Sequence, residues 1–286
     1  VKIWKYKGLN LYLLDCDLEE NGDWHRLTYN LYGGAYPNAE FERVVQEMIL
    51  GIGGIYAIKE LGIDPEFYHF NDGHAIFAVH KLIYDYMKEY SVSFEVALNA
   101  LKSKIRFTTH TNVKDGNELH DINTLIQFGA NYNLSYNQLQ ALGSNDHYGG
   151  SNNYGMTIAA LNSSGKVNGV SVLHAKEANK LWSNVQNKPE IFAITNGVHR
   201  PTWQKEDIYE YAKEDNKDMV WNMHMKYKAN LINYVYAKTG VKLDINSLTI
   251  GFARRATGYK RWDLIFKNPL SIEDLIKRYN IQLIFA

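Results

Sequence analysis

Residues 251–261 bring together four cationic side chains directly after the apolar run 248–250. In open α/β sheets, ligands bind beyond the carboxyl ends of the strands, where backbone amides and helix N-termini favour anions. An arginine offers phosphate oxygens a planar fork and a lysine offers a point charge, so Arg255 and Lys260 could bind one phosphate from two directions. A solvated, cationic start of a helix explains the same pattern of charge equally well.

Three polar residues follow a short aromatic strand expected at 67–70. Asn71, Asp72 and His74 could hydrogen-bond a polar ligand such as a sugar at the end of this strand. The same residue types are also typical of a helix N-cap and a turn. Their spacing alone favours neither role.

Two further polar residues lie at the ends of predicted strands. His110 belongs to the β-rich segment 105–111, and Asn196 follows the strand expected at 191–194. Lone histidines are more often structural than functional, and Asn-Gly is a turn signal. Each residue therefore has an ordinary structural role as its alternative to ligand binding.

The histidines and the single cysteine do not form a metal-binding pattern. His69 belongs to the predicted strand, His74 and His80 are six residues apart, and no HExxH motif occurs. Cys16 supplies neither a zinc cluster nor an intrachain disulfide, which fits a reducing compartment. The sequence therefore predicts no metal site and a cytoplasmic protein.

The composition is that of a globular protein with room for one large or two ordinary domains. The chain has 286 residues, of which 45% are hydrophobic, and its 31 basic and 31 acidic residues give a formal net charge of zero. This balance gives no support for nucleic acid or a membrane surface as a partner. No apolar run reaches the roughly 18 residues of a membrane span, and the first residues lack the layout of a signal peptide.

Predicted strands alternate with segments of helical periodicity, which favours doubly wound α/β layers over a barrel or a sandwich. A helix expected at 40–61 contains Gly51, Gly53 and Gly54. Their place inside an amphipathic pattern favours close helix packing over phosphate binding. The segment 143–155, rich in Ser, Asn and Gly, is predicted to be a mobile loop.

The last residues, 281–286, form a predicted strand with no element after it. A parallel strand that is buried on both faces needs neighbouring strands and crossover helices. We therefore expect the chain to be an internal fragment of a longer protein, and the lack of an initiator methionine agrees with this expectation.

Four segments together resemble the α-glucan phosphorylase family, in particular its shorter bacterial and archaeal members. They occur in the family's order, at 70–74 (FNDGH), 107–111 (FTTHT) with 116–118 (GNE), 193–199 (AITNGVH), and 251–255 (GFARR) with 259–261 (YKR). Further support comes from 32–34, 46–47, and 167–170 with His174. One such segment is a weak signal, whereas four in order are specific, and they run through most of the chain.

The resemblance implies a GT-B architecture, in which two Rossmann-like domains enclose the active site. Residues 1–199 would form most of the N-terminal, glucan-side domain without its start. Residues 200–286 would begin the C-terminal, cofactor-side domain, which would be incomplete. Asn196 would then lie near the junction of the two domains.

The resemblance also implies a sugar side of the site. His110 and Asn196 would hold the transferred glucosyl unit, and the backbone carbonyl of His110 would favour the positive charge that develops at the anomeric carbon. Asn71, Asp72 and His74 would line the same side.

A phosphate side is implied by the last segment. Arg255 and Lys260 would contact the substrate phosphate and, with His110, take part in catalysis, since cations in a poorly hydrated cleft stabilise developing charge. Tyr259 would be a neighbour of this phosphate. Thr257 stands where some members of the family have histidine.

The reaction implied by the resemblance is reversible phosphorolysis: inorganic phosphate removes a terminal α-1,4-linked glucose from a glucan and gives α-glucose 1-phosphate with retained configuration. The implied cofactor is pyridoxal 5′-phosphate, whose Schiff-base lysine is expected beyond Ala286. We therefore expect the parent protein to be the enzyme, and the isolated chain to lack activity and stable cofactor. The implied partners are glucan, phosphate and glucose 1-phosphate, with no nucleic acid or membrane and with room for a homodimer.

Two other functions remain open from the sequence. A nucleotide-sugar-dependent glycosyltransferase would share the GT-B architecture and would use the cationic pair for a diphosphate. A non-catalytic glucan-binding module would bind maltodextrin without turnover. A fold shared with an enzyme does not decide among these functions.

Overall fold

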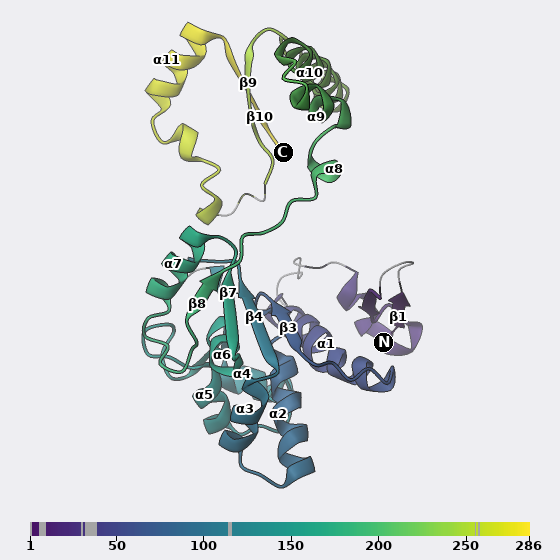
Figure 1. The fold of residues 1–286 in the computed structure, drawn as a ribbon, viewed down its shortest axis with the longest axis vertical. Helices are drawn as coiled ribbons and strands as arrows, with labels where there is room; N and C mark the ends of the chain where they lie inside the picture. Colours follow the sequence, from purple (N-terminus) through teal and green to yellow (C-terminus); the bar gives the residue numbers. More distant parts are fainter. Residues whose placement is uncertain are drawn as a thin grey trace. The chain divides into compact units, whose positions relative to one another are not determined.

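The computed structural model describes residues 2–5, 10–29, 31, 39–113, 116–254, 256 and 258–286. The chain divides into two compact units, Val1–Asn196 and Gly197–Ala286 (Figure 1). Both units combine helices with a parallel sheet, so the predicted α/β class is confirmed. Among the described residues, no helix is both long enough and apolar enough to cross a membrane.

A four-stranded parallel sheet lies at the centre of the first unit (Figure 1). Its strands lie side by side in chain order: β3 (Tyr68–Asn71), β4 (Ile105–Thr109), β7 (Lys166–Gly169) and β8 (Ile191–Ala193). The register pairs Asn71 with Thr108, Thr109 with Gly169, and Gly169 with Ala193. Because all four strands run the same way, their carboxyl ends lie along one edge of the sheet.

The helices of this unit share one apolar core with the sheet. They are α1 (Ala39–Glu60), α2 (Phe77–Tyr90), α3 (Phe94–Lys102), α4 (Ile122–Gln127), α5 (Tyr136–Gly143), α6 (Met156–Ser163) and α7 (Val172–Leu181). Ser93, Ser135 and Ser171 accept hydrogen bonds from first-turn amides and so begin α3, α5 and α7. Every residue of α6 is buried, and this helix packs on β4.

Two short antiparallel pairs add to this unit. Near the N-terminus, β1 (Lys2–Lys5) pairs with β2 (Tyr12–Asp15), which is followed by the 3₁₀ segment η1 (Glu19–Thr28). Farther along the chain, β5 (Leu119–Asp121) pairs with β6 (Asn153–Gly155).

The strand β6 corrects the prediction of a loop at 143–155, which is wrong for the last three residues. Tyr154 is fully buried, and its hydroxyl lies 2.6 Å from His80 Nε2. The other nitrogen of His80 lies 2.8 Å from the backbone oxygen of Ala130, so both nitrogens have protein partners. The buried ring of Tyr154, whose hydroxyl has a hydrogen-bond partner, packs β6 against the core. The polar composition of the segment did not indicate this strand.

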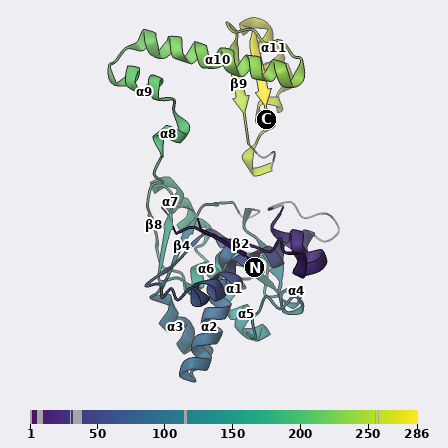
Figure 2. The same cartoon turned by 90° about the vertical axis from the view of Figure 1, so that its right-hand side faces the viewer.

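The second unit contains a two-stranded parallel sheet of β9 (Leu248–Phe252) and β10 (Ile281–Phe285), with Leu248 opposite Ile281 (Figure 2). Its helical segments are α8 (Arg200–Trp203), α9 (Glu206–Lys213), α10 (Lys217–Thr239), η4 (Gly258–Lys260), η5 (Leu264–Phe266) and α11 (Pro269–Tyr279). Several large apolar side chains are exposed here, such as Trp221 at 61% and Leu270 at 79%. This unit therefore has a smaller core than the first.

The two units meet in the chain between Asn196 and Gly197, close to the boundary predicted between residues 199 and 200. Their identification as the glucan-side and cofactor-side domains of a GT-B protein stays a prediction. The four strands of the central sheet follow one another without a reversal of order, whereas a doubly wound sheet reverses order at a switch point. The doubly wound arrangement therefore also stays a prediction.

Gly51 allows α1 to approach the turn before α2. A Cβ atom on Gly51 would lie 2.7 Å from the backbone nitrogen of Ala78 and 2.9 Å from the backbone oxygen of Ala75. Backbone atoms in a packed core cannot move aside as a flexible side chain can. A Cβ atom on Gly54 would meet no atom of the described residues within 4 Å. The prediction of close helix packing is therefore confirmed for Gly51, whereas no described residue makes such a contact at Gly54.

We expect Gly51→Ala to lower the free energy of unfolding by about 1–3 kcal/mol, because the added methyl group overpacks the contact between α1 and the turn before α2. Gly54→Ala is the matched control in the same helix. It should raise the free energy of unfolding by up to about 1 kcal/mol, because alanine favours a helix and has room there. Urea denaturation measures both changes, and equal stabilities of the two variants would contradict the close contact.

Candidate functional site

Polar side chains gather at the carboxyl edge of the parallel sheet. His110 follows β4, and its Nε2 lies 2.8 Å from Oδ1 of Asn71, the last residue of β3. An amide oxygen only accepts hydrogen bonds, so His110 Nε2 carries a proton and donates. Asn196 follows β8, and its backbone amide donates to the Val170 carbonyl oxygen at 3.2 Å. The structure thus joins Asn71 to His110 directly and brings Asn196 to the same edge.

A chain of hydrogen bonds crosses three strands close to this edge. The Thr108 hydroxyl donates to Asn168 Oδ1 at 2.7 Å and accepts from His69 Nε2 at 2.7 Å. Thr108 is 6% exposed and Asn168 is 8% exposed. Buried hydrogen bonds of this kind hold neighbouring strands in one register. Sequence reasoning gave these residues no site role, because polar residues within a strand do not reveal which strand lies beside them.

Asp72 has a backbone conformation that L-residues rarely adopt. Its φ is 67° and its ψ is 179°, a region that glycine occupies almost alone. Its backbone amide donates to the Thr108 carbonyl oxygen at 2.9 Å, and its Oδ1 accepts from the Gly73 amide at 3.0 Å. The capping role that the sequence left open is therefore confirmed for Asp72. Its role in sugar binding stays a prediction, as does that of Asn71.

His174 lies in the first turn of α7, near the segment that follows β4. Its Nδ1 accepts from the Val170 amide at 3.3 Å, and its backbone oxygen accepts from Asn112 Nδ2 at 2.9 Å. Burial lowers the pKa of His174, and the nearby backbone of His110 opposes this effect. A neutral imidazole thus lies beside the backbone of His110, whose carbonyl group the resemblance singled out.

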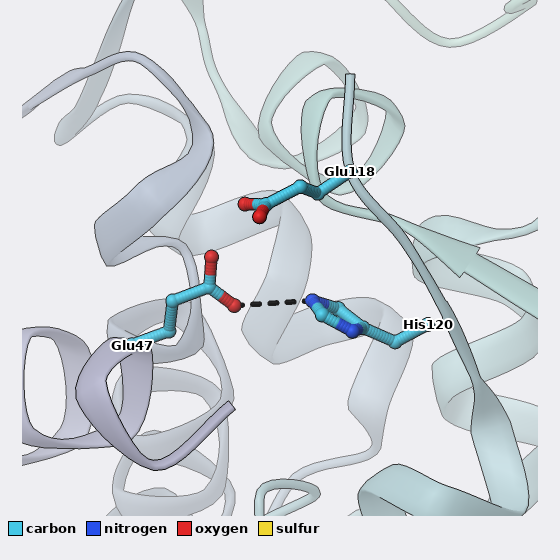
Figure 3. A group of neighbouring side chains, drawn as sticks. All are labelled: Glu47, Glu118 and His120. Atoms are coloured by element: carbon cyan, nitrogen blue, oxygen red, sulfur yellow. Dashed lines mark hydrogen bonds and ion pairs between the residues drawn. The ribbon is translucent and has the colours of Figure 1, made fainter. Parts of the chain in front are cut away.

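His74 belongs to a group of charged side chains between α1 and the segments that follow β3 and β4. Arg43 Nη2 donates to His74 Nδ1 at 2.7 Å. The same guanidinium donates to both carboxylate oxygens of Glu118, at 2.6 and 2.5 Å, and lies 3.0 Å from Glu47 Oε1. On the other side of Glu47, Oε2 lies 3.1 Å from His120 Nε2 (Figure 3).

Sequence reasoning assigned no role to Arg43, Glu47, Glu118 or His120. Arg43 and Glu118 are 75 residues apart in the chain, and local spacing cannot show that they meet. The sequence pointed to Glu47 and Glu118 only through the phosphorylase-like segments 46–47 and 116–118, which contain them.

Burial and the neighbouring charges decide the protonation of this group. Glu47 is 1% exposed, and burial together with Glu118 raises its pKa to about 10. Burial raises the pKa of Glu118 as well, but hydrogen bonds with His74 and Arg43 lower it by more. Burial lowers the pKa of His120. At neutral pH the group therefore holds a protonated Glu47, an ionised Glu118 and a neutral His120 beside the Arg43 cation.

The same oxygen and nitrogen atoms are of the kinds that bind metal ions. Those of Glu47, Glu118 and His120 lie within 4.8 Å of one another. Arg43 already lies against both carboxyl groups, so its guanidinium supplies the positive charge that a metal ion would bring. We therefore assign no metal ion to this group, and the sequence-based expectation of no metal site stays a prediction.

The predicted phosphate side belongs to the second unit and is described only in part. Lys260 ends η4 and is half-buried. Arg255 and Thr257 lie outside the described residues, as does the side chain of Tyr259. The roles of Arg255, Lys260 and Tyr259 in phosphate binding therefore stay predictions.

Known proteins similar to this chain match it over nearly its whole length. A maltodextrin phosphorylase of Thermococcus litoralis is 32% identical across 94% of the chain, and a glycogen phosphorylase of Aquifex aeolicus is 30% identical across 96%. An uncharacterised protein of Methanocaldococcus jannaschii is 34% identical across 96%. The chain spans 36%, 46% and 49% of the lengths of these three proteins, respectively. No family model matches the chain. The resemblance carried by four segments is thus confirmed across the chain.

We expect Asp72→Gly to have a higher free energy of unfolding than Asp72→Ala, by about 1–3 kcal/mol, because both lose the cap and only glycine relieves the strain at positive φ. Chemical denaturation of the two variants measures the difference. The same pair of substitutions at Asp218, in the first turn of α10, is the control and should give the opposite order, because glycine weakens a helix. An Asp72→Ala variant as stable as Asp72→Gly would show that the strain is absent.

The raised pKa of Glu47 makes stability depend on pH. Between about pH 4.5 and 10 the folded protein keeps a proton on Glu47 that the unfolded chain releases, so this contribution is complete below pH 4.5 and is lost as the pH rises. Glu47→Gln imitates the protonated acid at every pH. We therefore expect the free energy of unfolding of the wild type to fall relative to Glu47→Gln by up to about 1.4 kcal/mol per pH unit between about pH 6 and 9.

Denaturation curves recorded across this pH range test the effect of Glu47. The exposed Glu177 provides the control, because Glu177→Gln should follow the wild type at each pH. Parallel pH profiles of the wild type and Glu47→Gln would mean that Glu47 is ionised in the folded protein.

Proposed function

Since the chain is a relative of maltodextrin and glycogen phosphorylases over 94–96% of its length, we propose that the protein acts in reversible phosphorolysis of α-1,4-glucans. The observation that carries this proposal is the hydrogen bond between His110 and Asn71, which joins two of the phosphorylase-like segments at the carboxyl edge of the sheet. Convergent polar groups at this edge are the usual ligand site of a parallel α/β sheet.

In the proposed reaction, the side chains of the first unit bind and orient the terminal glucosyl unit. Asn71, His110 and Asn196 offer amide and imidazole groups that match sugar hydroxyls. The backbone carbonyl of His110 favours positive charge at the anomeric carbon, and the neutral His174 beside it adds no opposing cation. Asp72 and His74 line the same sugar, on the segment that follows β3.

The proposed chemistry replaces one bond at the anomeric carbon with another. The bond to the glycosidic oxygen breaks, an oxygen of inorganic phosphate takes its place on the same face, and a proton from that phosphate passes to the leaving glucan hydroxyl. Arg255 and Lys260 are proposed to hold the phosphate, because fixed cations stabilise its charge without reorganising during the reaction. The products are glucose 1-phosphate and a glucan shorter by one unit.

The proposal includes a GT-B architecture, with Val1–Asn196 in the glucan-side domain and Gly197–Ala286 in the cofactor-side domain. It also implies pyridoxal 5′-phosphate, which is held through a lysine amine. Lys81 is a deeply buried lysine of the described residues, but its Nζ donates to Asp85 and Tyr132 at 2.8 and 3.0 Å. An ammonium group held in this way is not a nucleophile. Lys81 is therefore not the lysine that would hold this cofactor, and no proposed step passes through it.

The test is the formation of glucose 1-phosphate from maltodextrin and inorganic phosphate. The protein should be assayed at the full length of its relatives, with and without pyridoxal phosphate. We expect product only when phosphate and cofactor are both present, and none from the 286-residue chain alone.

Two other outcomes would contradict the proposal in different ways. Glucosyl transfer from a nucleotide sugar without any use of inorganic phosphate would identify a nucleotide-sugar glycosyltransferase. Binding of maltodextrin with no turnover of any donor would identify a glucan-binding module.

A further inference from the structure

The Arg43 guanidinium determines where the neutral His74 ring carries its proton. A guanidinium only donates hydrogen bonds and stays charged at all ordinary pH values. Arg43 Nη2 lies 2.7 Å from His74 Nδ1, so Nδ1 accepts. The proton of the neutral imidazole must then lie on Nε2, the nitrogen on the other side of the ring.

We propose that Arg43 is a positioning residue of the candidate sugar site, which holds His74 in one orientation and with its proton on Nε2. This inference rests on the proposed function, because His74 is a residue expected to line the bound sugar. Arg43 lies on α1 and not on a segment that follows a strand of the sheet, and it acts through His74.

Arg43 is itself held on two further sides. Its paired contacts with Glu118 match the planar fork of a guanidinium to both oxygens of a carboxylate. Glu47 is protonated, so its Oε1 can donate to Glu118 while its Oε2 accepts from His120 Nε2 at 3.1 Å. Figure 3 shows the carboxyl groups of Glu118 and Glu47 facing each other. Each carboxyl group that contacts Arg43 thus has a second partner, which limits its movement.

The segment that carries His74 has little freedom to move independently of the rest of the site. It begins at Asn71, whose Oδ1 accepts the hydrogen bond from His110. A Cβ atom on Gly73 would lie 3.1 Å from Met156 Cβ, so α6 packs closely against the middle of this segment. A displaced His74 ring would therefore press on a tightly packed turn that is connected directly to Asn71.

Protonation of His74 should release the contact with Arg43. Among the residues that the structure describes, the charged and titratable groups around His74 include Arg43 and Glu47 on α1, Asp72 on its own segment, and Glu118 after β4. Glu118 raises the pKa of His74 more than burial and Arg43 lower it. A proton on Nδ1 would face the donor Arg43, whereas the carboxylate of Glu118 lies 3.7 Å from the same nitrogen. The protonated ring would therefore turn from Arg43 to Glu118.

The first test is the protonation state of His74 in the wild-type 286-residue chain, measured by ¹⁵N NMR of the imidazole nitrogens, starting at a pH well above the raised pKa of the ring, where the ring is neutral. We expect a bare Nδ1 and a protonated Nε2, followed by protonation of Nδ1 as the pH falls. A neutral His74 with its proton on Nδ1 would overturn the proposal. This measurement needs no substitution and no enzyme activity.

The second test is the substitution Arg43→Lys, which keeps the positive charge. A lysine ammonium group lacks the planar fork with which the guanidinium contacts His74, Glu118 and Glu47 together. We expect the neutral His74 ring to populate both of its tautomers, one with the proton on Nε2 and the other with the proton on Nδ1. Arg278→Lys is the matched control, because Arg278 has one exposed carboxylate partner, Asp274, on α11. An Arg43→Lys variant that keeps the wild-type form of His74 would overturn the proposal, and if this variant does not fold, the wild-type spectrum decides.

The third test uses the protein at the full length of its relatives, with maltodextrin and inorganic phosphate. We expect Arg43→Lys to lower kcat/KM about tenfold to a hundredfold, because small errors in position are costly in catalysis, and Arg278→Lys to leave it unchanged. An unchanged kcat/KM in a variant whose neutral His74 ring populates both tautomers would overturn the proposal. If the wild type makes no glucose 1-phosphate, the proposed function fails, and the NMR results alone decide whether Arg43 holds His74.

Discussion

Parallel pairing of β3, β4, β7 and β8 is the constraint on which the candidate site depends. It brings the residues that follow each strand to one edge, although they lie far apart in the chain. The hydrogen bonds from His69 through Thr108 to Asn168 hold three of these strands in register. With that register, Asn71 and His110 meet at 2.8 Å. A shift of one residue in any strand would turn its side chains to the opposite face and separate them.

The group around Arg43 shows how charge can be buried beside such an edge. A buried ion loses its hydration, and hydrogen bonds must replace it. Arg43 donates two hydrogen bonds to the Glu118 carboxylate, and Glu47 is protonated. The Arg43 cation therefore faces one anion, Glu118, instead of two competing carboxylates. Ion pairs of this kind add little to the stability of a fold. The arrangement contributes orientation, because it connects α1 to the segments after β3 and β4.

Local signals predicted the elements that depend on short-range physics. The helix expected at 40–61 is found at Ala39–Glu60, because apolar periodicity acts within a few turns. The prediction for 143–155 was wrong where Tyr154 is buried against His80, which is a contact over 74 residues. Gly51 and Gly54 look alike in the sequence and differ only in whether another segment lies against them.

The sequence by itself determined the α/β class, the polar residues at the strand ends and the resemblance to the phosphorylases, which the comparison with known proteins confirmed. These features depend on periodicity and on short segments, which a single chain displays in order. The tertiary structure alone decided that His110 donates to Asn71, that Asp72 is strained, and that Arg43 meets His74 and Glu118. Such contacts depend on the register of strands and the approach of helices, because burial and proximity arise only when distant segments pack together.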